Sequence, residues 1–338
     1  MKAWILEKQS NIEDRPLKMA KVPAPVPGEK EVRVKIQACG ICRTDIHIAE
    51  GDLPLKKSPL ILGHEIVGFV DQIGAGVTKF KPRDPVGISW LYSTCGKCKY
   101  CLKGKENYCP EFQCTGWDVD GGFAEYITIQ ENFALSLPKI HMAPEDSAPL
   151  MCPGIAGYCA FKLTELEKGD KLGLFGFGPT AYYVLKAAQY LGIEVYVSTR
   201  SSASKEKARK EGAVWVGNVF EENIPNRLDS AILFPPAGDL VEPVLRHVKI
   251  GGILVLAPVS MSVFEIKDYS SHLWGRDIRT LYNVKKGEAE EFLKIAGETN
   301  MRMPRRVFPF EELQDAMIMV KEGKITEPNA VIKMNVKR

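Results

Sequence analysis

The order of apolar segments after about residue 170 constrains the fold more than any other feature of this 338-residue chain. Strand-like apolar segments alternate there with helix-like stretches of mixed composition. The strand-like segments read LGLF, VYVST, AILF and GILVLA, and the helix-like stretches between them cover Pro179–Leu191, Ser204–Glu211 and Asp239–Val248. Such alternation predicts βαβ units, and therefore a parallel sheet with helices packed on it.

The N-terminal half has a different pattern. Up to about residue 150 it consists of short β-rich segments such as VRVKIQACG, EIVGFVDQIG and FAEYITI, which Pro- and Gly-containing turns separate. We interpret this half as all-β-like. After Tyr282 we expect a helix over Glu288–Glu298, a short helix over Glu311–Glu322 and a closing strand, AVIKM, that could pair with either half.

The overall composition is that of an ordinary globular protein, with 45% hydrophobic and 26% charged residues, and it excludes disorder, collagen and coiled coil. The 45 Lys and Arg residues nearly balance 42 Asp and Glu residues, and a net charge of +3 is too small to predict a nucleic-acid or membrane partner. No apolar run approaches the roughly 18 residues of a membrane span, so we expect a cytoplasmic protein.

Four of the nine cysteines fall within fifteen positions, which in a reducing compartment indicates a metal site rather than disulfides. These four are Cys95, Cys98, Cys101 and Cys109. Four Cys ligands leave no open coordination position, so a site of this kind stabilises structure and does no chemistry. The thiolates suit zinc, although ligand type alone leaves an iron–sulfur cluster open. The same spacing could also belong to four unrelated buried thiols or to a zinc-ribbon nucleic-acid module.

A second constellation comes from three separated pieces of sequence. They are the stretch from Cys39 to His47, the tripeptide Gly63-His64-Glu65, and the tripeptide Met151-Cys152-Pro153. A catalytic zinc needs about three protein ligands, with a fourth position open to water or substrate, and two Cys with one His would satisfy it. The alternative is that His64 and Cys152 are packed core residues, since the sequence alone does not bring the pieces together.

The turn after the LGLF segment carries the pattern G-x-G-x-x-A, formed by Gly176, Gly178 and Ala181, with Pro179 and Thr180 between them. The glycines let the backbone approach a pyrophosphate, and the N-terminus of the following helix favours its negative charge. Pro179 suits the first position of that helix. The motif is short, but its place between a predicted strand and a predicted helix favours a dinucleotide site.

About twenty residues after Gly178, NAD-preferring proteins usually carry an acidic residue for the adenosine ribose. This chain has Thr199 and Arg200 at that point, with Lys205 nearby and no carboxylate. Hydroxyls and a guanidinium would receive a 2′-phosphate that a carboxylate would repel. We therefore predict NADP(H) in preference to NAD(H), with an exposed loop arginine as the alternative explanation of Arg200.

Four segments occur in the order CGICRTDIH, GHEIVGFVDQIGAGV, CGKCKYCLKGKENYC and DGGFAEY. In this respect the chain resembles the zinc-dependent medium-chain alcohol dehydrogenase family over nearly its whole length, and the STRSS stretch resembles its NADP-using, cinnamyl-alcohol-type branch. The resemblance implies an α/β protein in two domains: a GroES-like β-rich catalytic domain, residues 1–152 and 284–338, and a doubly wound parallel-sheet Rossmann domain, residues 153–283. It also implies that Cys42 rather than Cys39 is a catalytic zinc ligand.

By the same resemblance, His64 and Cys152 complete the ligand set, Glu65 is a neighbour or alternating ligand, and Arg43 faces the cofactor pyrophosphate. Arg43 read by itself could equally be a solvated arginine. Three further roles follow from the positions of the residues: Thr44 can place its hydroxyl on a substrate alkoxide, Asp45 can accept the ring N–H of His64, and His47 can pass a proton to solvent. The alternative for His47 is an ordinary surface histidine.

Together these features predict an oxidoreductase that transfers a hydride between a primary alcohol or aldehyde and NADP(H), with two zinc ions per chain. Leu53, Trp90 and Trp117 fall where similar enzymes line the alcohol pocket, although the tryptophans could also be core fillers. The competing hypotheses are an NAD-dependent alcohol dehydrogenase, a zinc-free quinone reductase relative, and a nonenzymatic zinc- and nucleotide-binding regulator. We expect a small-molecule substrate and a homo-oligomer, dimer or tetramer.

Overall fold

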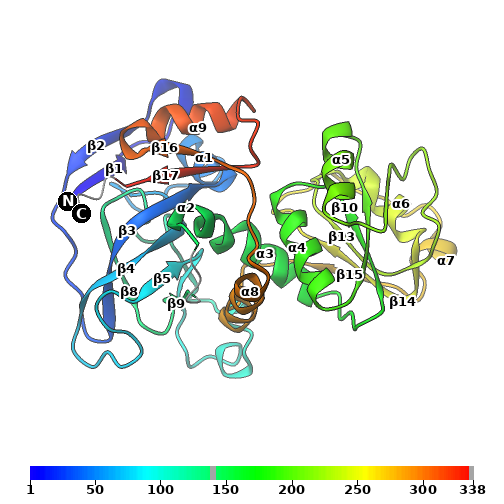
Figure 1. Ribbon diagram of the computed structural model, residues 1–338, viewed down its shortest axis with the longest axis horizontal. Coiled ribbons are helices and arrows are strands. Elements are labelled where there is room, and N and C mark those ends of the chain that lie inside the picture. The colour runs from blue at the N-terminus through cyan, green and yellow to red at the C-terminus, as the bar shows by residue number, and fades with distance from the viewer. Residues whose placement is uncertain (138–141, 335–338) are drawn as a thin grey trace. The chain divides into compact units, whose positions relative to one another are not determined.

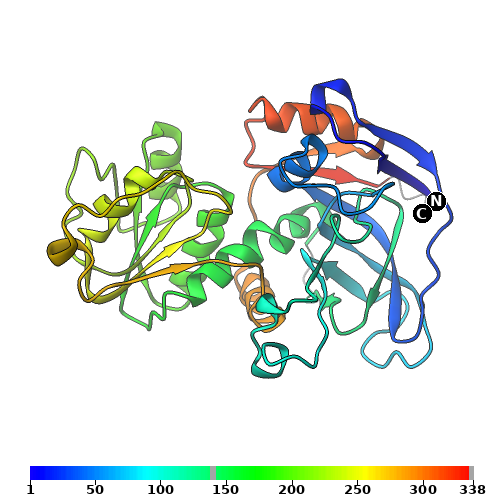
Figure 2. The same ribbon diagram turned by 180° about the vertical axis from the view of Figure 1, so that it is seen from behind.

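The computed structural model describes residues 1–137 and 142–334, and Figures 1 and 2 show the ribbon from opposite sides. The chain divides into two compact units. The first contains Met1–Ile155 and Asn283–Arg338, and the second contains Ala156–Tyr282. The predicted domain boundaries, after residue 152 and before residue 284, lie close to these.

A seven-stranded sheet, ordered β16-β17-β3-β4-β5-β9, forms the framework of the first unit. β3 (Glu31–Ile41) is its longest strand; buried positions alternate up to Gln37, because successive side chains point to opposite faces, and its last four residues are all buried. β4 pairs with one edge of β3. The other edge is shared, because β8 pairs with its first half and β17 with its second half. The closing strand predicted from AVIKM therefore belongs to the sheet of the first unit.

The remaining strands of this sheet are β4 (Glu65–Ile73), β5 (Pro85–Ile88), β8 (Tyr126–Gln130), β9 (Leu135–Ser136), β16 (Arg305–Pro309) and β17 (Asn329–Lys333). Two small sheets accompany it, formed by β1 (Lys2–Leu6) with β2 (Leu17–Lys21) and by β6 (Leu91–Ser93) with β7 (Gln113–Cys114). The helices of this unit are α1 (Arg43–Glu50), α2 (Pro144–Ser147), α8 (Lys286–Thr299) and α9 (Leu313–Lys321), with short 3-10 turns η1 (Ile12–Asp14), η2 (Cys101–Lys103), η3 (Glu106–Tyr108), η4 (Ala148–Met151) and η6 (Phe310–Glu312).

The second unit contains a six-stranded parallel sheet in the order β12-β11-β10-β13-β14-β15. Numbered within the unit, this order is 3-2-1-4-5-6, which is that of doubly wound dinucleotide-binding folds. Its strands are β10 (Lys171–Phe175), β11 (Glu194–Ser198), β12 (Trp215–Gly217), β13 (Leu228–Leu233), β14 (Val248–Leu256) and β15 (Asp277–Thr280). α4 (Pro179–Tyr190), α5 (Ser202–Lys210), η5 (Gly238–Leu240), α6 (Val241–Leu245) and α7 (Tyr269–His272) connect them, and α3 (Pro153–Lys162) leads into this unit. The predicted fold class, a GroES-like β-rich domain with a Rossmann domain, is confirmed.

Two details differ from the sequence-based expectation. The helix predicted over Asp239–Val248 is shorter, because a 3-10 turn precedes α6 and the strand β14 already begins at Val248. The N-terminal half is not all β, because α1 covers Arg43–Glu50. Its sequence, RTDIHIAE, contains β-branched residues that favour strands, but burial of Ile46, Ile48 and Ala49 against the core stabilises a helix instead.

Candidate active site

One group of potential metal ligands gathers where β3 ends and β4 begins. Cys42 follows the last residue of β3, His64 precedes the first residue of β4, which is Glu65, and Cys152 lies just before α3. The antiparallel register sets Gly40 opposite Glu65, so the end of one strand lies beside the start of the other. The ligand atoms of Cys42, His64, Glu65 and Cys152 all lie within 4.8 Å of one another.

The chemistry and spacing of this group fit a zinc ion. Two Sγ atoms at about 2.3 Å from a tetrahedral zinc ion lie about 3.8 Å apart. The Sγ atoms of Cys42 and Cys152 are separated by 3.9 Å, too far for a disulfide. Two thiols and an imidazole form a ligand set that leaves one position of a tetrahedral ion open. The three separated pieces of sequence therefore meet in space.

Asp45 holds the candidate ligands Cys42 and His64 in place through hydrogen bonds. Its carboxylate is fully buried, and it accepts hydrogen bonds from the backbone N–H groups of Cys42 at 2.9 Å and Gly63 at 3.1 Å. Nδ1 of His64 lies 3.1 Å from Oδ1 of the same carboxylate. A carboxylate partner favours the proton on Nδ1, which leaves Nε2 as the nitrogen available to a metal.

The proton equilibria of the group reflect burial and mutual charge. Burial lowers the pKa of His64, but the negative charges of Asp45 and Cys42 outweigh it and hold that pKa well above its usual value. A hydrogen bond from Cys152 lowers the pKa of Cys42, whereas burial and then the Cys42 charge raise the pKa of Glu65. A cation bound among these groups would take the place of protons.

Glu65 depends on a residue that sequence reasoning missed. Glu65 is 5% exposed, and a Cβ atom added to Gly40 would lie 1.9 Å from its Oε2. Gly87 plays a similar part next to Cys152, because a Cβ there would lie 2.2 Å from Sδ of Met151. Gly40 lies within the CGICRTDIH segment and Gly87 within β5, but nothing in the sequence indicates that either glycine makes room for a side chain of the site; the only local signal is a glycine inside a strand.

The other predicted residues of this segment lie on α1 or just after it. Oγ1 of Thr44 lies 3.6 Å from Sγ of Cys42. His47 is about half exposed, with Nδ1 2.7 Å from the Asp52 carboxylate. Arg43 donates from Nη1 to the backbone oxygen of Lys321. The cofactor whose pyrophosphate Arg43 is predicted to face would bind to the second unit. The role of Arg43 in cofactor binding therefore stays a prediction.

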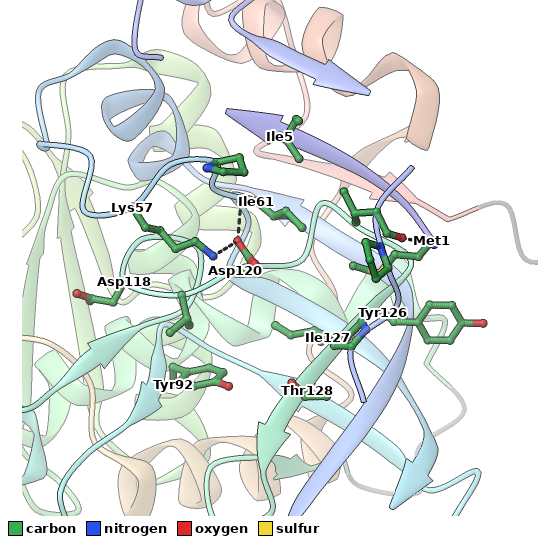
Figure 3. A pocket seen from close by; sticks show the side chains of 16 residues that line it. Met1, Ile5, Lys57, Ile61, Tyr92, Asp118, Asp120, Tyr126, Ile127 and Thr128 are labelled. Atoms are coloured by element: carbon green, nitrogen blue, oxygen red, sulfur yellow. Dashed lines mark hydrogen bonds and ion pairs between the residues drawn. The ribbon is translucent and has the colours of Figure 1, made fainter. Parts of the chain in front are cut away.

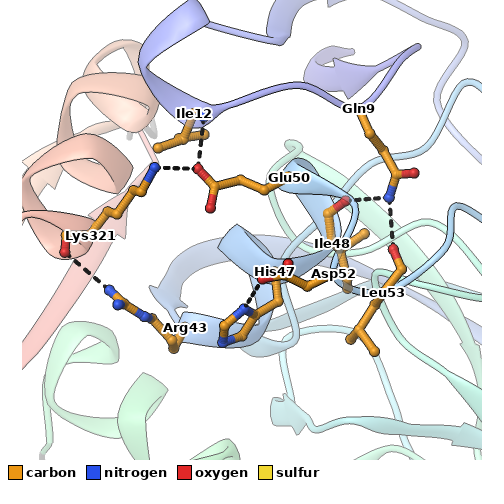
Figure 4. A network of polar contacts seen from close by, with 9 residues as sticks. All are labelled: Gln9, Ile12, Arg43, His47, Ile48, Glu50, Asp52, Leu53 and Lys321. Carbon is orange, nitrogen blue, oxygen red and sulfur yellow. Dashed lines mark hydrogen bonds and ion pairs between the residues drawn. The ribbon is translucent and has the colours of Figure 1, made fainter.

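Polar contacts hold α1 and the loop after it in place (Figure 4). Glu50, at the end of α1, accepts from the backbone N–H of Ile12 at 3.0 Å and from Nζ of Lys321 at 2.7 Å. Nε2 of Gln9 donates to the backbone oxygens of Ile48 and Leu53. The backbone of Leu53 is therefore held both by Gln9 of the N-terminal segment and by α1, because its N–H donates to the backbone oxygen of His47 at 3.3 Å.

Aromatic rings extend from His64 toward Leu53. The Trp90 ring meets the His64 ring edge-on at 5.0 Å, and Trp117 stacks on Trp90 at 5.9 Å. The indole N–H of Trp117 donates to the backbone oxygen of Pro54 at 3.0 Å, and Nζ of Lys56 lies 3.5 Å above the Trp117 ring. All three predicted pocket residues are partly buried against the core of the first unit, and Trp90 among them contacts the candidate ligand His64.

The four clustered cysteines also meet. Sγ–Sγ distances are 3.6 Å for Cys98 and Cys101, 3.6 Å for Cys95 and Cys109, and 3.9 Å for Cys95 and Cys101. These values match the edge of about 3.8 Å expected for a zinc–sulfur tetrahedron. Backbone N–H groups, that of Cys101 first, lower the pKa of Cys98 to about 7, whereas burial raises the pKa of Cys109 to about 12. We call residues 95–109 the four-cysteine lobe.

In the second unit, the predicted glycine turn links β10 to α4. Gly176 has φ +85° and packs against Pro235, so its conformation favours glycine. Gly178 precedes Pro179 as the N-cap of α4, and a Cβ added to Gly178 would meet nothing within 4 Å. The turn lies at the carboxyl end of β10, where the strand order reverses between β10 and β13. Such a switch point with open space beside a helix N-terminus is where dinucleotides bind.

The residues predicted to choose the cofactor follow the next strand. Thr199 comes directly after β11, Arg200 is exposed, and the hydroxyl of Ser201 caps α5 by accepting from the N–H of Ser204. Nζ of Lys205 lies 4.0 Å from the carboxylate of Glu221 and 3.9 Å from that of Glu222, so its role toward the cofactor stays a prediction. Thr180 and Ala181 lie in the first turn of α4, where Ala181 is buried.

A separate cavity of about 430 Å³ lies in the first unit (Figure 3). Apolar side chains such as Ile5 and Ile61 line it, together with an ion pair of 2.8 Å between Lys57 and Asp120. None of the candidate ligands or predicted pocket residues borders this cavity. It therefore takes no part in the site described here.

A GroES-like β-rich unit accompanied by a doubly wound parallel-sheet unit of the dinucleotide-binding type is the architecture of nicotinamide-dependent oxidoreductases, and two clusters of potential metal ligands lie in the first unit. Comparison with known proteins supports this assignment to the nicotinamide-dependent oxidoreductases. Residues 28–139 match the family described as the alcohol dehydrogenase GroES-like domain. A probable alcohol dehydrogenase of Mycobacterium tuberculosis is 38% identical over 331 residues, covering 96% of this chain and 95% of the relative.

An alcohol dehydrogenase of Geobacillus stearothermophilus is 32% identical over 334 residues, covering 96% of this chain and 97% of the relative. The solved structure of CAD from Helicobacter pylori, complexed with NADP(H), has a TM-score of 0.85 and 27% identity, with 100% of this chain and 99% of that chain covered. The chain belongs to the medium-chain alcohol dehydrogenase family. It is an alcohol-oxidising, nicotinamide-dependent enzyme, as the sequence predicts. Among the described residues, no helix is long and apolar enough to cross a bilayer.

Proposed function

We propose that this enzyme is zinc-dependent and transfers a hydride between a primary alcohol or aldehyde and NADP(H). The observation that carries the proposal is the convergence of Cys42, His64 and Cys152, with the buried Glu65, on one point within 4.8 Å. Two thiols and an imidazole suit zinc and leave a position for substrate. When bound, the zinc ion would polarise the substrate C–O bond and the nicotinamide would supply or accept the hydride.

The remaining chemistry falls to residues of this chain. Asp45 keeps the proton on Nδ1 of His64 and so directs Nε2 to the metal. Oγ1 of Thr44 lies 3.6 Å from Sγ of Cys42, where the hydroxyl can accept the proton of the alcohol while it releases its own proton toward His47. His47 passes that proton to solvent, because Asp52 engages its Nδ1 and the half-exposed ring keeps Nε2 for exchange.

A second zinc ion belongs in the four-cysteine lobe. The four thiols occupy all positions of a tetrahedral ion, so this site stabilises the lobe and binds no substrate. The pKa of Cys98, lowered to about 7 by backbone N–H groups, lets this thiol ionise for a metal near neutral pH. The near-neutral charge of the chain gives no support to a nucleic-acid role for this lobe.

The preference for NADP(H) rests on the chain around Thr199. β11 ends at Ser198, and the next residues supply hydroxyls and the exposed guanidinium of Arg200 in place of a carboxylate. Both groups favour a 2′-phosphate. The relative of known structure that contains NADP(H) supports this preference. Lys205 contributes less than the sequence suggests, because Glu221 and Glu222 lie near its ammonium group.

The substrate wall consists of Trp90, Trp117 and Leu53. Two indoles beside His64 narrow the space and favour primary alcohols, small aliphatic or aromatic, over branched secondary ones. We propose no single alcohol. For assembly we propose a dimer or tetramer of this chain, which light scattering on the purified enzyme would measure directly.

The proposal is tested by metal content and by rates with the two cofactors. We expect two zinc ions per chain by mass spectrometry, and faster oxidation of NADPH than of NADH with a panel of primary aldehydes. Cys42→Ser should leave one zinc ion per chain. It should lower kcat by about 10³-fold or more, because the metal ion lowers the activation free energy by several kcal/mol. Full activity of that variant would refute the zinc mechanism, and turnover with NADH alone would refute the cofactor preference.

A further inference from the structure

Asn283 makes two hydrogen bonds that join distant parts of the first unit. Its side-chain oxygen accepts from the indole N–H of Trp90 at 3.2 Å. Its side-chain nitrogen donates to the backbone oxygen of Asn107 at 3.3 Å. Asn283 has φ +54°, a left-handed conformation that asparagine adopts more readily than most residues. One amide thus connects the predicted substrate wall with another segment of the fold.

That other segment is the four-cysteine lobe. Asn107 lies in η3, between Cys101 and Cys109. A second bond attaches the same lobe to the same stretch of chain, because the backbone N–H of Lys286 donates to Oε1 of Glu106 at 2.7 Å. Two bonds at neighbouring positions hold residues 283–286 against the lobe and restrict how the Asn283 amide can turn.

The Trp90 indole needs such a restraint. The ring contacts the rings of His64 at 5.0 Å and Trp117 at 5.9 Å and packs against the apolar core, and apolar ring packing tolerates several orientations. The indole N–H is the one strong donor of this side chain. Because the ring is partly buried, an orientation that leaves the N–H without an acceptor is penalised. The bond to Asn283 therefore selects one orientation of the ring.

We propose that Asn283 is a positioning residue for substrate selection: it sets the orientation of Trp90, and the four-cysteine lobe braces it. The inference rests on the proposed function, in which Trp90 lines the alcohol pocket. Within the described part of the chain, the hydrogen bonds of the Asn283 side chain go to Trp90 and Asn107 and not to His64 or the other candidate ligands. Its effect on the reaction passes through the indole, so it should alter discrimination between substrates more than the rate with the best one.

Asn283→Gly is the central variant, because glycine accepts the positive φ without strain and removes only the side chain. Asn300→Gly is the matched control. Asn300 also has a left-handed backbone, φ +50°, at the C-cap of α8, and its side chain contacts Arg302 on the surface. Trp90→Phe removes the indole N–H and keeps an aromatic ring. Trp90→Phe with Asn283→Gly completes a double-mutant cycle.

The measured quantity is the ratio of kcat/KM for ethanol to kcat/KM for benzyl alcohol, with zinc content and melting temperature determined for each variant. We expect Asn283→Gly to change the ratio by about tenfold, the size of one hydrogen bond's contribution. The change should come mainly from KM, and Asn300→Gly should leave the ratio within about twofold. In the Trp90→Phe background, Asn283→Gly should have no further effect on the ratio.

Three results would overturn the inference. One is an Asn283→Gly enzyme with a lower melting temperature and an unchanged ratio, which would make the residue purely structural. Another is an equal change from Asn283→Gly with or without the indole. The last is an unchanged ratio in Trp90→Phe, which would remove Trp90 from the pocket. Failure of the proposed function looks different: the unmodified enzyme would then turn over neither alcohol, or would do so without zinc.

Discussion

Replacing Gly40 with alanine tests how the fold makes room for the candidate ligands. Gly40 lies on β3 directly opposite Glu65 on β4. An added Cβ would lie 1.9 Å from Oε2, 2.7 Å from Cδ and 2.9 Å from Cβ of Glu65. Carbon and oxygen atoms that are not bonded approach only to about 3.2 Å or more, so the carboxyl would have to leave its place beside Cys42 and Cys152.

The loss in the free energy of unfolding caused by Gly40→Ala follows from the burial of Glu65. Glu65 is 5% exposed, so displacing its side chain requires the buried groups around it to move. Overpacking by one methyl group costs about 1–3 kcal/mol, and this site belongs at the upper end because backbone-fixed Cβ atoms are part of the clash. A unit of this size loses about 2–4 °C in melting temperature per kcal/mol. We expect a decrease of about 5–10 °C and a loss of zinc from the Cys42 site.

The assay combines thermal unfolding, zinc stoichiometry and kcat/KM for Gly40→Ala. Gly287→Ala is the matched control, because a Cβ there meets nothing within 4 Å and the residue lies in the first turn of α8. That control should be neutral or slightly stabilising, since alanine suits a helix better than glycine. A Gly40→Ala enzyme with an unchanged melting temperature and two zinc ions would refute the argument that only glycine at position 40 leaves room for the Glu65 carboxyl.

Three further substitutions address the rest of the site. Asp45→Asn replaces the buried carboxylate facing His64 with an amide, and zinc affinity at that site, measured by chelator competition, should fall about 10–100-fold; unchanged affinity would exclude the orienting role. Thr199→Asp should reduce the NADPH-to-NADH ratio of kcat/KM at least about tenfold, because a carboxylate repels the 2′-phosphate; an unaffected ratio would remove this loop from cofactor choice. Cys98→Ser should lower the melting temperature by several degrees while Cys42 keeps its zinc, and parallel loss of both ions would contradict two independent sites.

Much of the second unit could be predicted from the sequence. Its central strands contain short buried apolar runs, Leu172–Phe175 in β10 and Ala231–Leu233 in β13, and the helices between the strands follow a different period. The glycine turn was recognisable because it sits between such a strand and a helix that starts with Pro179. The spatial order of the strands, by contrast, depends on which helix packs on which face, and no local pattern records that.

The first unit is harder to predict from sequence, because its strands are short and pair with strands that lie far away along the chain. α1 was missed because local β-branched residues argue for a strand, while the core that buries Ile46 and Ile48 is assembled from other segments. The AVIKM strand could be recognised, but its partner could not: β17 pairs with β3, almost 300 residues earlier, through a register such as Ile332 opposite Cys39. Such pairings depend on long-range burial.

The chemistry of the donors is a property of the sequence by itself: thiols, an imidazole and a glycine-rich turn have the same ligand and phosphate preferences in any surroundings. Their meeting is a property of the tertiary structure. Cys42 and His64 meet, with Cys152 beside them, because the antiparallel register brings the end of β3 and the start of β4 together. The same register places Gly40 opposite Glu65, where any larger residue would overlap the Glu65 side chain. The bond between Asn283 and Trp90 joins residues 193 positions apart, and only the packing of the whole unit could determine it.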